Sequence, residues 1–324
     1  MKRWISALVF AGLALCGLMS SCMLISQCTD SPALTARSNA SLETRLKQHV
    51  DYLATTCRPR SYTHAAQQKA AVDYITRSLR ESGGNVDFQT FRVDNREYVN
   101  VRSVIPGREE GRIIIGAHYD TCGNTPGADD NASGVAGLLE TARMLKGIQP
   151  QYTIELVAYA NEEPPYFKTI HMGSAHHARL MAESKTTVHA MLCLEMIGYY
   201  SDREKSQNYP SRSLSWIYPD KGNFIAVLGN WGSVSLARKV QKSLEGHMPT
   251  VRLNAPEVTG AFSLSDHINY WQYDMPAVMI TDTAFYRNAN YHQSTDTPDT
   301  LDYGRMARVV QGVAAAVREL CRKP

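Results

Sequence analysis

Four apolar runs, each leading into polar residues, constrain the fold of this chain most strongly. They are RIIIGAHYD (112–120), YTIELVAYANEE (152–163), VHAMLCLEMIGYY (188–200) and PAVMITDTAFY (276–286). Stretches with helical periodicity lie around and between them, at 41–58, 64–82, 132–147, 173–184, 232–246 and 303–322. Shorter runs that suit edge strands lie at 85–93, 97–105, 223–230 and 249–254. Strands that alternate with helices predict an α/β three-layer sandwich: a mostly parallel, mixed central sheet with helices on both faces.

The first 22 residues have the pattern of a targeting segment. Lys2 and Arg3 precede the uncharged apolar stretch WISALVFAGLALCGLM, and small residues lead to Cys22. This order resembles a bacterial lipoprotein processing site, at which Cys22 becomes lipidated and anchors the protein to a membrane; a cleaved secretory signal and an uncleaved anchor are the alternatives. We therefore expect a signal peptide over 1–22, a tether over 23–40, one domain over 41–324, and an exported, periplasmic or cell-envelope protein.

Charge and cysteine content exclude two classes of function. The net charge is +3 with scattered lysines and arginines, so no nucleic-acid partner is expected. None of the seven cysteines is in C-x-x-C spacing, which argues against a four-cysteine zinc site. In an exported protein, a disulfide could join two of five cysteines, but the sequence leaves the pairing open. These five are Cys28, Cys57, Cys122, Cys193 and Cys321.

Candidate metal ligands follow each of the four apolar runs. Functional residues of open α/β sheets collect at the carboxyl ends of the strands. The candidates are His118, Asp130, Glu162, Glu163, Glu195 and His292. Histidines and carboxylates without cysteine suit a hydrolytic zinc site, and metals about 3.5–4 Å apart can share one carboxylate. Asp130, in a loop beside Gly127, is the bridging candidate. One member of the Glu162-Glu163 pair would bind metal, while the other would handle the proton of the attacking water.

Each candidate also has a purely structural interpretation. His118 alone would more commonly be a core histidine, Asp130 a helix N-cap, and Glu162-Glu163 a solvated pair. The shared placement of all these residues favours the metal site, and a carboxylate at Glu195, within an apolar run, needs a cation. The sequence has no G-x-S-x-G, HExxH or Walker pattern. Aromatic residues flank the candidates and suit either a substrate pocket or the core; they are Tyr199, Tyr200, Phe285, Tyr286 and Tyr291.

The motifs together resemble those of the dinuclear-zinc aminopeptidase family, which also includes glutaminyl cyclases, glutamate carboxypeptidases and the transferrin-receptor ectodomain. The motifs are GAHYDT, PGADDNASGVAGLLETARML, AYANEE, LEMIGYY and YHQSTDTPDTL, in the family's order within residues 64–322. The resemblance implies a zinc-exopeptidase fold over 41–324 that holds two zinc ions. It also implies that a cis peptide bond joins Asp130 to Asn131.

The resemblance implies a role for each candidate. His118 and Glu195 would bind one zinc, although the family usually carries Asp at the position of Glu195. Asp130 would bridge the two ions. The second zinc would be bound by Glu163 and His292. Glu162 would be the general base, and Asp120 would orient His118.

Three functions remain open at this point. The first, and favoured, function is an exported, monomeric peptidase that removes N-terminal residues from peptides. The second is a glutaminyl cyclase-like acyltransferase that uses one zinc on the same scaffold. The third is a surface binding protein without catalysis, which is disfavoured because no expected ligand is missing. The YHQSTDTPDTL segment resembles the peptidases more closely than the cyclases.

Overall fold

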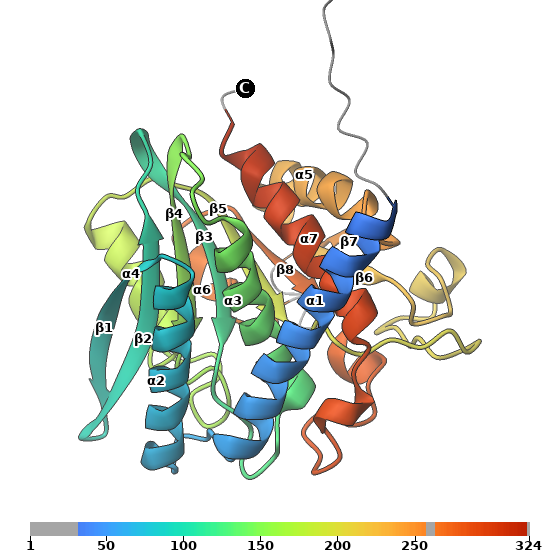
Figure 1. Ribbon diagram of the computed structural model, residues 1–324, viewed down its shortest axis with the longest axis horizontal. Coiled ribbons are helices and arrows are strands. Elements are labelled where there is room, and N and C mark those ends of the chain that lie inside the picture. The colour runs from blue at the N-terminus through green and yellow to red at the C-terminus, as the bar shows by residue number, and fades with distance from the viewer. Residues whose placement is uncertain (1–31, 257–262, 323–324) are drawn as a thin grey trace, which may run out of the picture.

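The fold is built around one eight-stranded sheet (Figure 1). The computed structural model describes residues 32–256 and 263–322. The predicted signal peptide, with Cys22 as its expected lipidation site, and Cys28 lie outside these ranges. The strands are β1 (Asn85–Val93), β2 (Arg96–Ile105), β3 (Glu109–His118), β4 (Tyr152–Tyr159), β5 (Val188–Glu195), β6 (Ile225–Gly229), β7 (Thr250–Asn254) and β8 (Ala277–Thr281).

The sheet order is β1-β2-β4-β3-β5-β8-β6-β7. The four central strands β4, β3, β5 and β8 run parallel to one another. Antiparallel pairs join β1 to β2, β2 to β4, and β8 to β6, and β7 returns to a parallel pairing with β6. The predicted mixed, mostly parallel sheet is therefore confirmed, with its parallel pairs concentrated at the centre.

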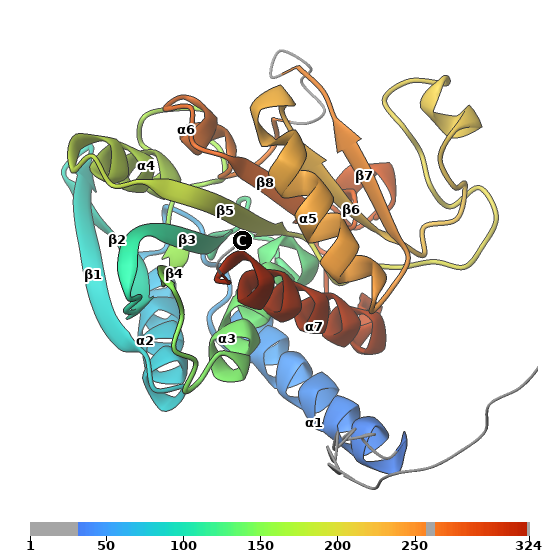
Figure 2. The ribbon, with the colours of Figure 1, turned by 90° about the horizontal axis from the view of Figure 1, so that it is seen from above.

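Helices cover both faces of the sheet. They are α1 (Pro32–Asp51), α2 (Ala65–Glu81), α3 (Gly134–Met144), α4 (Gly173–Glu183), α5 (Val234–Glu245), α6 (Ile268–Trp271) and α7 (Tyr303–Leu320). Figure 2 shows α4 and α6 on one side, and α1, α2, α3 and α7 on the other. Helix α1 begins at Pro32, within the segment expected as a tether. In the described part of the chain, no helix is both long and apolar enough to cross a bilayer.

The central strand β3 explains why two helical layers are needed. Side chains alternate between the faces of a strand, so a strand in the middle of a covered sheet must be apolar on both sides. Ile113 and Ile115 pack in the core with α1, α2, α3, α5 and α7, whereas Ile114 packs in the core with α4 and α6. All three isoleucines are fully buried. The uninterrupted apolar run is thus what a central parallel strand requires.

Candidate metal centre

The carboxyl ends of four neighbouring parallel strands meet at one edge of the sheet. His118 is the last residue of β3, and Glu195 is the last residue of β5. Glu162 and Glu163 follow the end of β4, and His292 lies in the loop beyond β8. The structure brings all of these side chains together, and the loop after β3 adds Asp130.

One group of side chains surrounds His118. Its Nε2 atom lies 3.2 Å from Oε2 of Glu195 and 3.4 Å from Oδ1 of Asp130. Oε2 of Glu162 is slightly farther from the same nitrogen, at 3.9 Å. All four side chains are buried. Ligand atoms of His118, Asp130 and Glu195 are mutually close enough to hold one metal ion.

A second group lies on the other side of Asp130. His292 Nε2 is 3.1 Å from Oδ2 of Asp130 and 3.2 Å from Oε2 of Glu163. The two carboxylate oxygens of Asp130 thus face different histidines. This division is what a carboxylate bridging two metal ions requires. A short side chain reaches this position because Gly127 adopts the left-handed conformation (φ 60°), and a Cβ there would meet the carbonyl oxygen of Asp130.

The separations fit coordination better than hydrogen bonding. Bonds of about 2.0–2.1 Å from zinc to nitrogen or oxygen give tetrahedral edges of about 3.3 Å. Charge-assisted hydrogen bonds are shorter, at about 2.7–2.9 Å. Within the described residues, both ring nitrogens of His118, Nε2 of His292 and Oε1 of Glu163 lack a hydrogen-bond partner. Buried polar atoms are rarely left unpaired, so this donor set fits divalent cations such as zinc.

The electrostatics of the metal-free cluster point the same way. Burial raises the pKa of Glu163 to about 8, with a further contribution from Asp130. Burial likewise raises the pKa of Glu195. The pKa of Glu162 lies well above its ordinary range, because burial and the charges of Glu195 and Glu163 outweigh the effect of His118. Several carboxylates therefore share a buried site that lacks enough positive charge to keep them all ionised. Bound cations would supply this charge.

Asp120 fixes the Glu162-Glu163 turn. Its two carboxylate oxygens accept hydrogen bonds from the backbone amides of Glu162 (3.1 Å) and Glu163 (3.0 Å). Its Oδ1 atom also lies 3.5 Å from Nδ1 of His118. The residue before the pair, Asn161, has a left-handed backbone (φ 60°), which turns the chain sharply enough for both glutamates to face the site. The sequence suggested an orienting role toward His118 but did not indicate this hold on the glutamates.

Asp296 fixes the backbone at Asp129 and Asp130 in the same way as Asp120 fixes the two glutamates. Its carboxylate accepts hydrogen bonds from the amides of Asp129 (2.9 Å) and Asp130 (3.1 Å), although it lies 166 residues away from Asp130. The peptide bond between Asp130 and Asn131 is cis, as the resemblance implied. Asn131 donates to the carbonyl of Leu194 (2.9 Å) and so joins this loop to the end of β5. No sequence signal singled out Asp296, although it lies in the quoted YHQSTDTPDTL segment.

Ser265 holds Glu195 in place. Its hydroxyl donates to Oε2 of Glu195 at 2.7 Å. Because the same oxygen lies 3.2 Å from His118, the additional methylene of glutamate relative to aspartate does not displace this carboxylate from the centre. Ser265 belongs to the SLSDH segment, whose order of Ser, Asp and His could suggest a hydrolase triad. Its contact identifies Ser265 as a residue that positions a candidate ligand.

Arg60 connects the loop after β3 to the rest of the fold. This arginine is fully buried and donates to four backbone carbonyls. The acceptors are Leu53, Tyr119, Pro126 and Gly127, at 2.6–3.0 Å. Burial lowers the pKa of Arg60 to about 10, so the guanidinium stays charged near neutral pH. The loop between His118 and Asp130 is thereby fixed at both ends.

We expect Arg60→Met to destabilise the fold strongly. The substitution keeps much of the apolar volume but leaves four buried carbonyls without donors, each costing about 1–3 kcal/mol. The free energy of unfolding should fall by at least about 3 kcal/mol in urea titrations. Arg58→Met is the control, because Arg58 is exposed and, among the residues that the structure describes, bonds only Asn124, so its loss should change stability little. Equal stability of the two variants would contradict this account of the loop.

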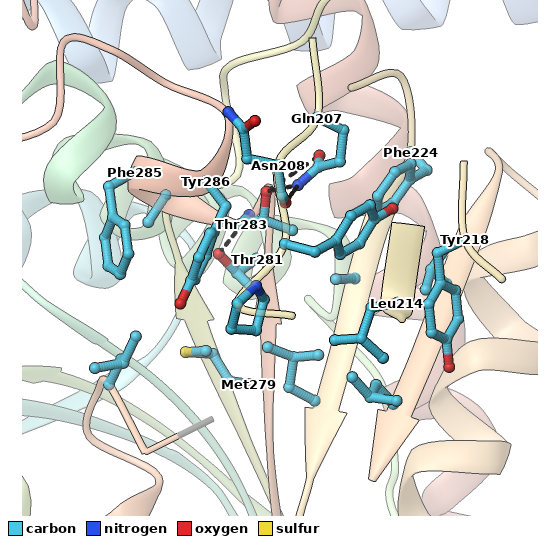
Figure 3. Close-up of a pocket in the computed structure, with 18 of the residues that line it drawn as sticks. Gln207, Asn208, Leu214, Tyr218, Phe224, Met279, Thr281, Thr283, Phe285 and Tyr286 are labelled. Atoms are coloured by element: carbon cyan, nitrogen blue, oxygen red, sulfur yellow. Dashed lines mark hydrogen bonds between the residues drawn. The ribbon is translucent and has the colours of Figure 1, made fainter. Parts of the chain in front are cut away.

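An apolar cavity, partly open to solvent, adjoins the centre (Figure 3). Glu195 and Tyr291 line its side toward the candidate ligands. Its other walls are mainly aliphatic and aromatic, including Leu214, Phe224 and Met279. Phe285, Tyr286 and Tyr291 line this cavity, whereas Tyr199 and Tyr200 belong to the core. Of the five aromatic residues that flank the candidate ligands, three thus belong to a pocket and two to the core.

Other polar clusters have structural partners. His177 contacts Glu155 (3.2 Å) and Tyr270 (2.6 Å), and the ring of His176 stacks on Phe91. These histidines therefore stabilise the packing of α4. Within the described residues, Cys57, Cys122, Cys193 and Cys321 are all free thiols. Cys193 is buried, as its apolar strand predicts.

The chain is similar to known peptidases in sequence and fold. The family description "Peptidase family M28" matches residues 100–317. Uncharacterized protein YfbL of Escherichia coli is 44% identical over 279 residues, which cover 83% of this chain and 85% of that protein. Probable aminopeptidase YDR415C of Saccharomyces cerevisiae is 24% identical over 78% of this chain and 64% of its own length. The chain therefore spans slightly less than two thirds of the yeast relative.

Solved structures share the fold at low sequence identity. The LapA aminopeptidase of Legionella pneumophila aligns with a TM-score of 0.70 and 21% identity over 89% of this chain and 75% of that one. BSAP, a zinc aminopeptidase from Bacillus subtilis, aligns with a TM-score of 0.70 and 15% identity over 87% and 95%. A glutaminyl cyclase of Porphyromonas gingivalis aligns with a TM-score of 0.64 and 19% identity over 87% and 98%. Since the family match covers most of the folded chain, this protein belongs to peptidase family M28.

Proposed function

We propose that this chain is an exported, monomeric zinc aminopeptidase that removes N-terminal residues from peptides at a two-metal centre. The observation that carries the proposal is the division of Asp130 between the His118 and His292 groups, with unpaired ligand atoms in both. His118 and Glu195 would hold one zinc, and Glu163 and His292 the other. Membership of a peptidase family supports hydrolysis of peptide bonds.

Glu162 is the proposed general base. Bound zinc would polarise the scissile carbonyl and lower the pKa of the attacking water. Glu162 is buried and lies farther from His118 than Glu195 and Asp130 do, which leaves its carboxylate available for proton transfer. It would accept the proton of the water and pass it to the leaving amine. Asp120 would act indirectly, because it fixes the turn that carries Glu162.

The apolar cavity would receive the side chain of the first residue. Small-molecule sites are concave and lined mainly by apolar and aromatic side chains, as this cavity is. Its apolar walls favour leucine, methionine and phenylalanine over charged side chains. Leucine aminopeptidases are among the relatives of this chain, for example in Coccidioides posadasii. We therefore propose peptides with a large apolar first residue as the substrate class.

Filling the cavity should change the preference for the first residue. Ala226, on β6, lines the cavity, so Ala226→Leu adds three carbons to its wall. We expect kcat/KM for leucyl and phenylalanyl anilides to fall tenfold or more relative to the alanyl anilide, since one methylene changes discrimination about 10–200-fold. Leu253→Ala enlarges the same cavity and should favour the phenylalanyl substrate. Parallel changes for all three substrates would exclude the cavity as the binding site.

Paired assays separate the three candidate functions. An aminoacyl anilide tests peptidase activity, and a peptide with N-terminal glutamine tests cyclisation. The proposal expects hydrolysis of the anilide by protein that holds close to two zinc ions. Cyclisation by protein with one zinc would favour the acyltransferase. Zinc-loaded, folded protein inactive on both substrates would favour the binding protein.

The N-terminal segment supports a second, independent proposal about location. We infer that Cys22 is lipidated and holds the domain at a membrane of the cell envelope. Bacterial lipoproteins are multiply acylated, and more than one chain is needed for stable anchoring. Cys22→Ser should therefore move the protein from the membrane fraction to the soluble exported fraction. Retention of the variant in the membrane would indicate an uncleaved anchor instead.

A further inference from the structure

Cys122 lies beside Glu163 and His292, and the proposed function gives this cysteine no role. It follows Asp120 by two residues in the loop after β3. Its Sγ atom, a carboxylate oxygen of Glu163 and an imidazole nitrogen of His292 all lie within 4.8 Å of one another. Of the free cysteines in the described residues, Cys122 alone is half-exposed. It is therefore a reachable thiol at the edge of the centre.

The two neighbours of Cys122 are fixed and have unused ligand atoms. Glu163 is only 4% exposed, and its backbone is held by Asp120. Within the described residues, neither Oε1 of Glu163 nor Nε2 of His292 has a hydrogen-bond partner. A buried carboxylate with an unpaired oxygen costs free energy unless a cation or donor completes it. The cluster can thus hold a cation on three side chains from three different loops.

A sulfur ligand is compatible with this spacing. Zinc–sulfur bonds of about 2.3 Å and zinc–nitrogen bonds of about 2.0–2.1 Å place the two ligand atoms about 3.6 Å apart in a tetrahedron. The ligand atoms already lie within 4.8 Å of one another, so Sγ needs to approach by no more than about 1 Å. The next residue, Gly123, is left-handed (φ 52°), and no atom lies within 4 Å of the place where its Cβ would be. The loop therefore has room for this movement.

We propose that Cys122 is an additional ligand of the second metal, which would then be held by Asp130, Glu163, His292 and Cys122. This inference rests on the proposed two-metal centre. Binding converts the thiol to a thiolate and releases one proton to solvent. The two metal positions then differ chemically, because the group around His118 contains no sulfur. A thiolate favours zinc, cobalt and cadmium over magnesium and manganese, so the second position would select softer metals.

Cobalt substitution of the full-length protein tests the assignment directly. Zinc is removed with a chelator, and two equivalents of Co²⁺ are added. We expect an intense near-ultraviolet absorption from thiolate-to-cobalt charge transfer. Cys122→Ser should abolish this absorption and weaken zinc binding at one position by at least about tenfold. Cys321→Ser is the control and should retain both properties, because Cys321 accepts a hydrogen bond from Gln151 at the amino end of β4, away from the centre. Circular dichroism verifies the fold of each variant.

Thiol labelling provides a second readout that does not depend on activity. Bound zinc should protect Cys122 from iodoacetamide, and chelation should expose it, as measured by mass spectrometry. Two bound cobalt ions without the charge-transfer absorption would overturn the role of Cys122 and leave the proposed function intact. Persistence of the absorption in Cys122→Ser would also overturn the role of Cys122 and leave the proposed function intact. A wild-type protein that binds no cobalt would overturn both the ligand assignment and the two-metal centre.

Discussion

Glu162→Gln should lower kcat by about 10²–10⁴-fold while both metal ions remain bound. The amide keeps the size and most hydrogen bonds of the carboxylate but cannot accept the proton of the attacking water. KM should change little, since the substitution removes an interaction made during the reaction. Zinc analysis beside steady-state kinetics on a leucyl anilide measures both effects. Glu110→Gln, at the exposed amino end of β3, is the control and should leave both unchanged.

Glu163→Gln should fail in a different way. The proposal gives Glu163 to the second metal, so the amide should loosen that ion and reduce turnover and substrate affinity together. The contrast between neighbouring glutamates is informative because both are buried and both are held by Asp120. Loss of metal in Glu162→Gln with retention in Glu163→Gln would reverse the two roles. Full activity in both variants would place the active site elsewhere.

Removing the metal should abolish hydrolysis and lower the melting temperature. Without cations, the carboxylates of Asp130, Glu162, Glu163 and Glu195 remain close together in a buried site. A ligand present at about a thousand times its Kd stabilises a fold by about 4 kcal/mol. With an entropy of unfolding of about 2.1 cal/mol/K per residue, that corresponds to a shift in Tm of about 7 °C for a domain of this size. Activity assays and calorimetry before and after chelation measure both changes, and added zinc should reverse them. A fully active metal-free protein would refute the proposed function.

The difference in Tm between the metal-bound and the metal-free protein should also grow as the pH rises from 5 to 8. In the metal-free protein the pKa of Glu163 is about 8, above the ordinary value of 4.5. Between these values the folded chain binds more protons than the unfolded chain, so stability falls as pH rises. His292, whose pKa is raised to about 12 by Asp130, Cys122 and Glu163 against the effect of burial, acts in the same direction above pH 6.5. Metal binding requires deprotonated ligands and therefore strengthens over the same interval. Calorimetry of both forms across this range checks the sign.

The strands and the candidate ligands could be predicted because one pattern carries both. Apolar runs mark buried strands, and parallel strands end at a common edge, so the polar residues that follow them meet. The chain shows this for His118, Glu195 and the Glu162-Glu163 pair, which helices and strands separate from one another in the sequence. The strand order could not be predicted from this pattern. Apolar alternation does not reveal that β4 lies between β2 and β3, or that β6 runs antiparallel to β8.

The supporting contacts could not be predicted from the same pattern. Asp296 bonds the amides of Asp129 and Asp130 across more than 160 residues, and Ser265 bonds Glu195 across 70. The guanidinium of Arg60 donates to backbone carbonyls, which have no sequence signature. Such contacts depend on where loops meet after the strands have paired. Hydrophobic periodicity carries no information about that step.

The hydrogen bonds from Asp120 and Asp296 have a consequence for the biosynthesis of the protein. Each carboxylate closes a turn by accepting two consecutive backbone amides, so both turns are shaped by the chain itself. In the proposed zinc enzyme, the polypeptide would therefore complete its fold before it binds metal, and acquisition of the ions would be a separate, bimolecular event. The place where the chain matures and the place where it obtains its ions need not be the same. Newly made protein could accumulate as an inactive, folded precursor until zinc is supplied.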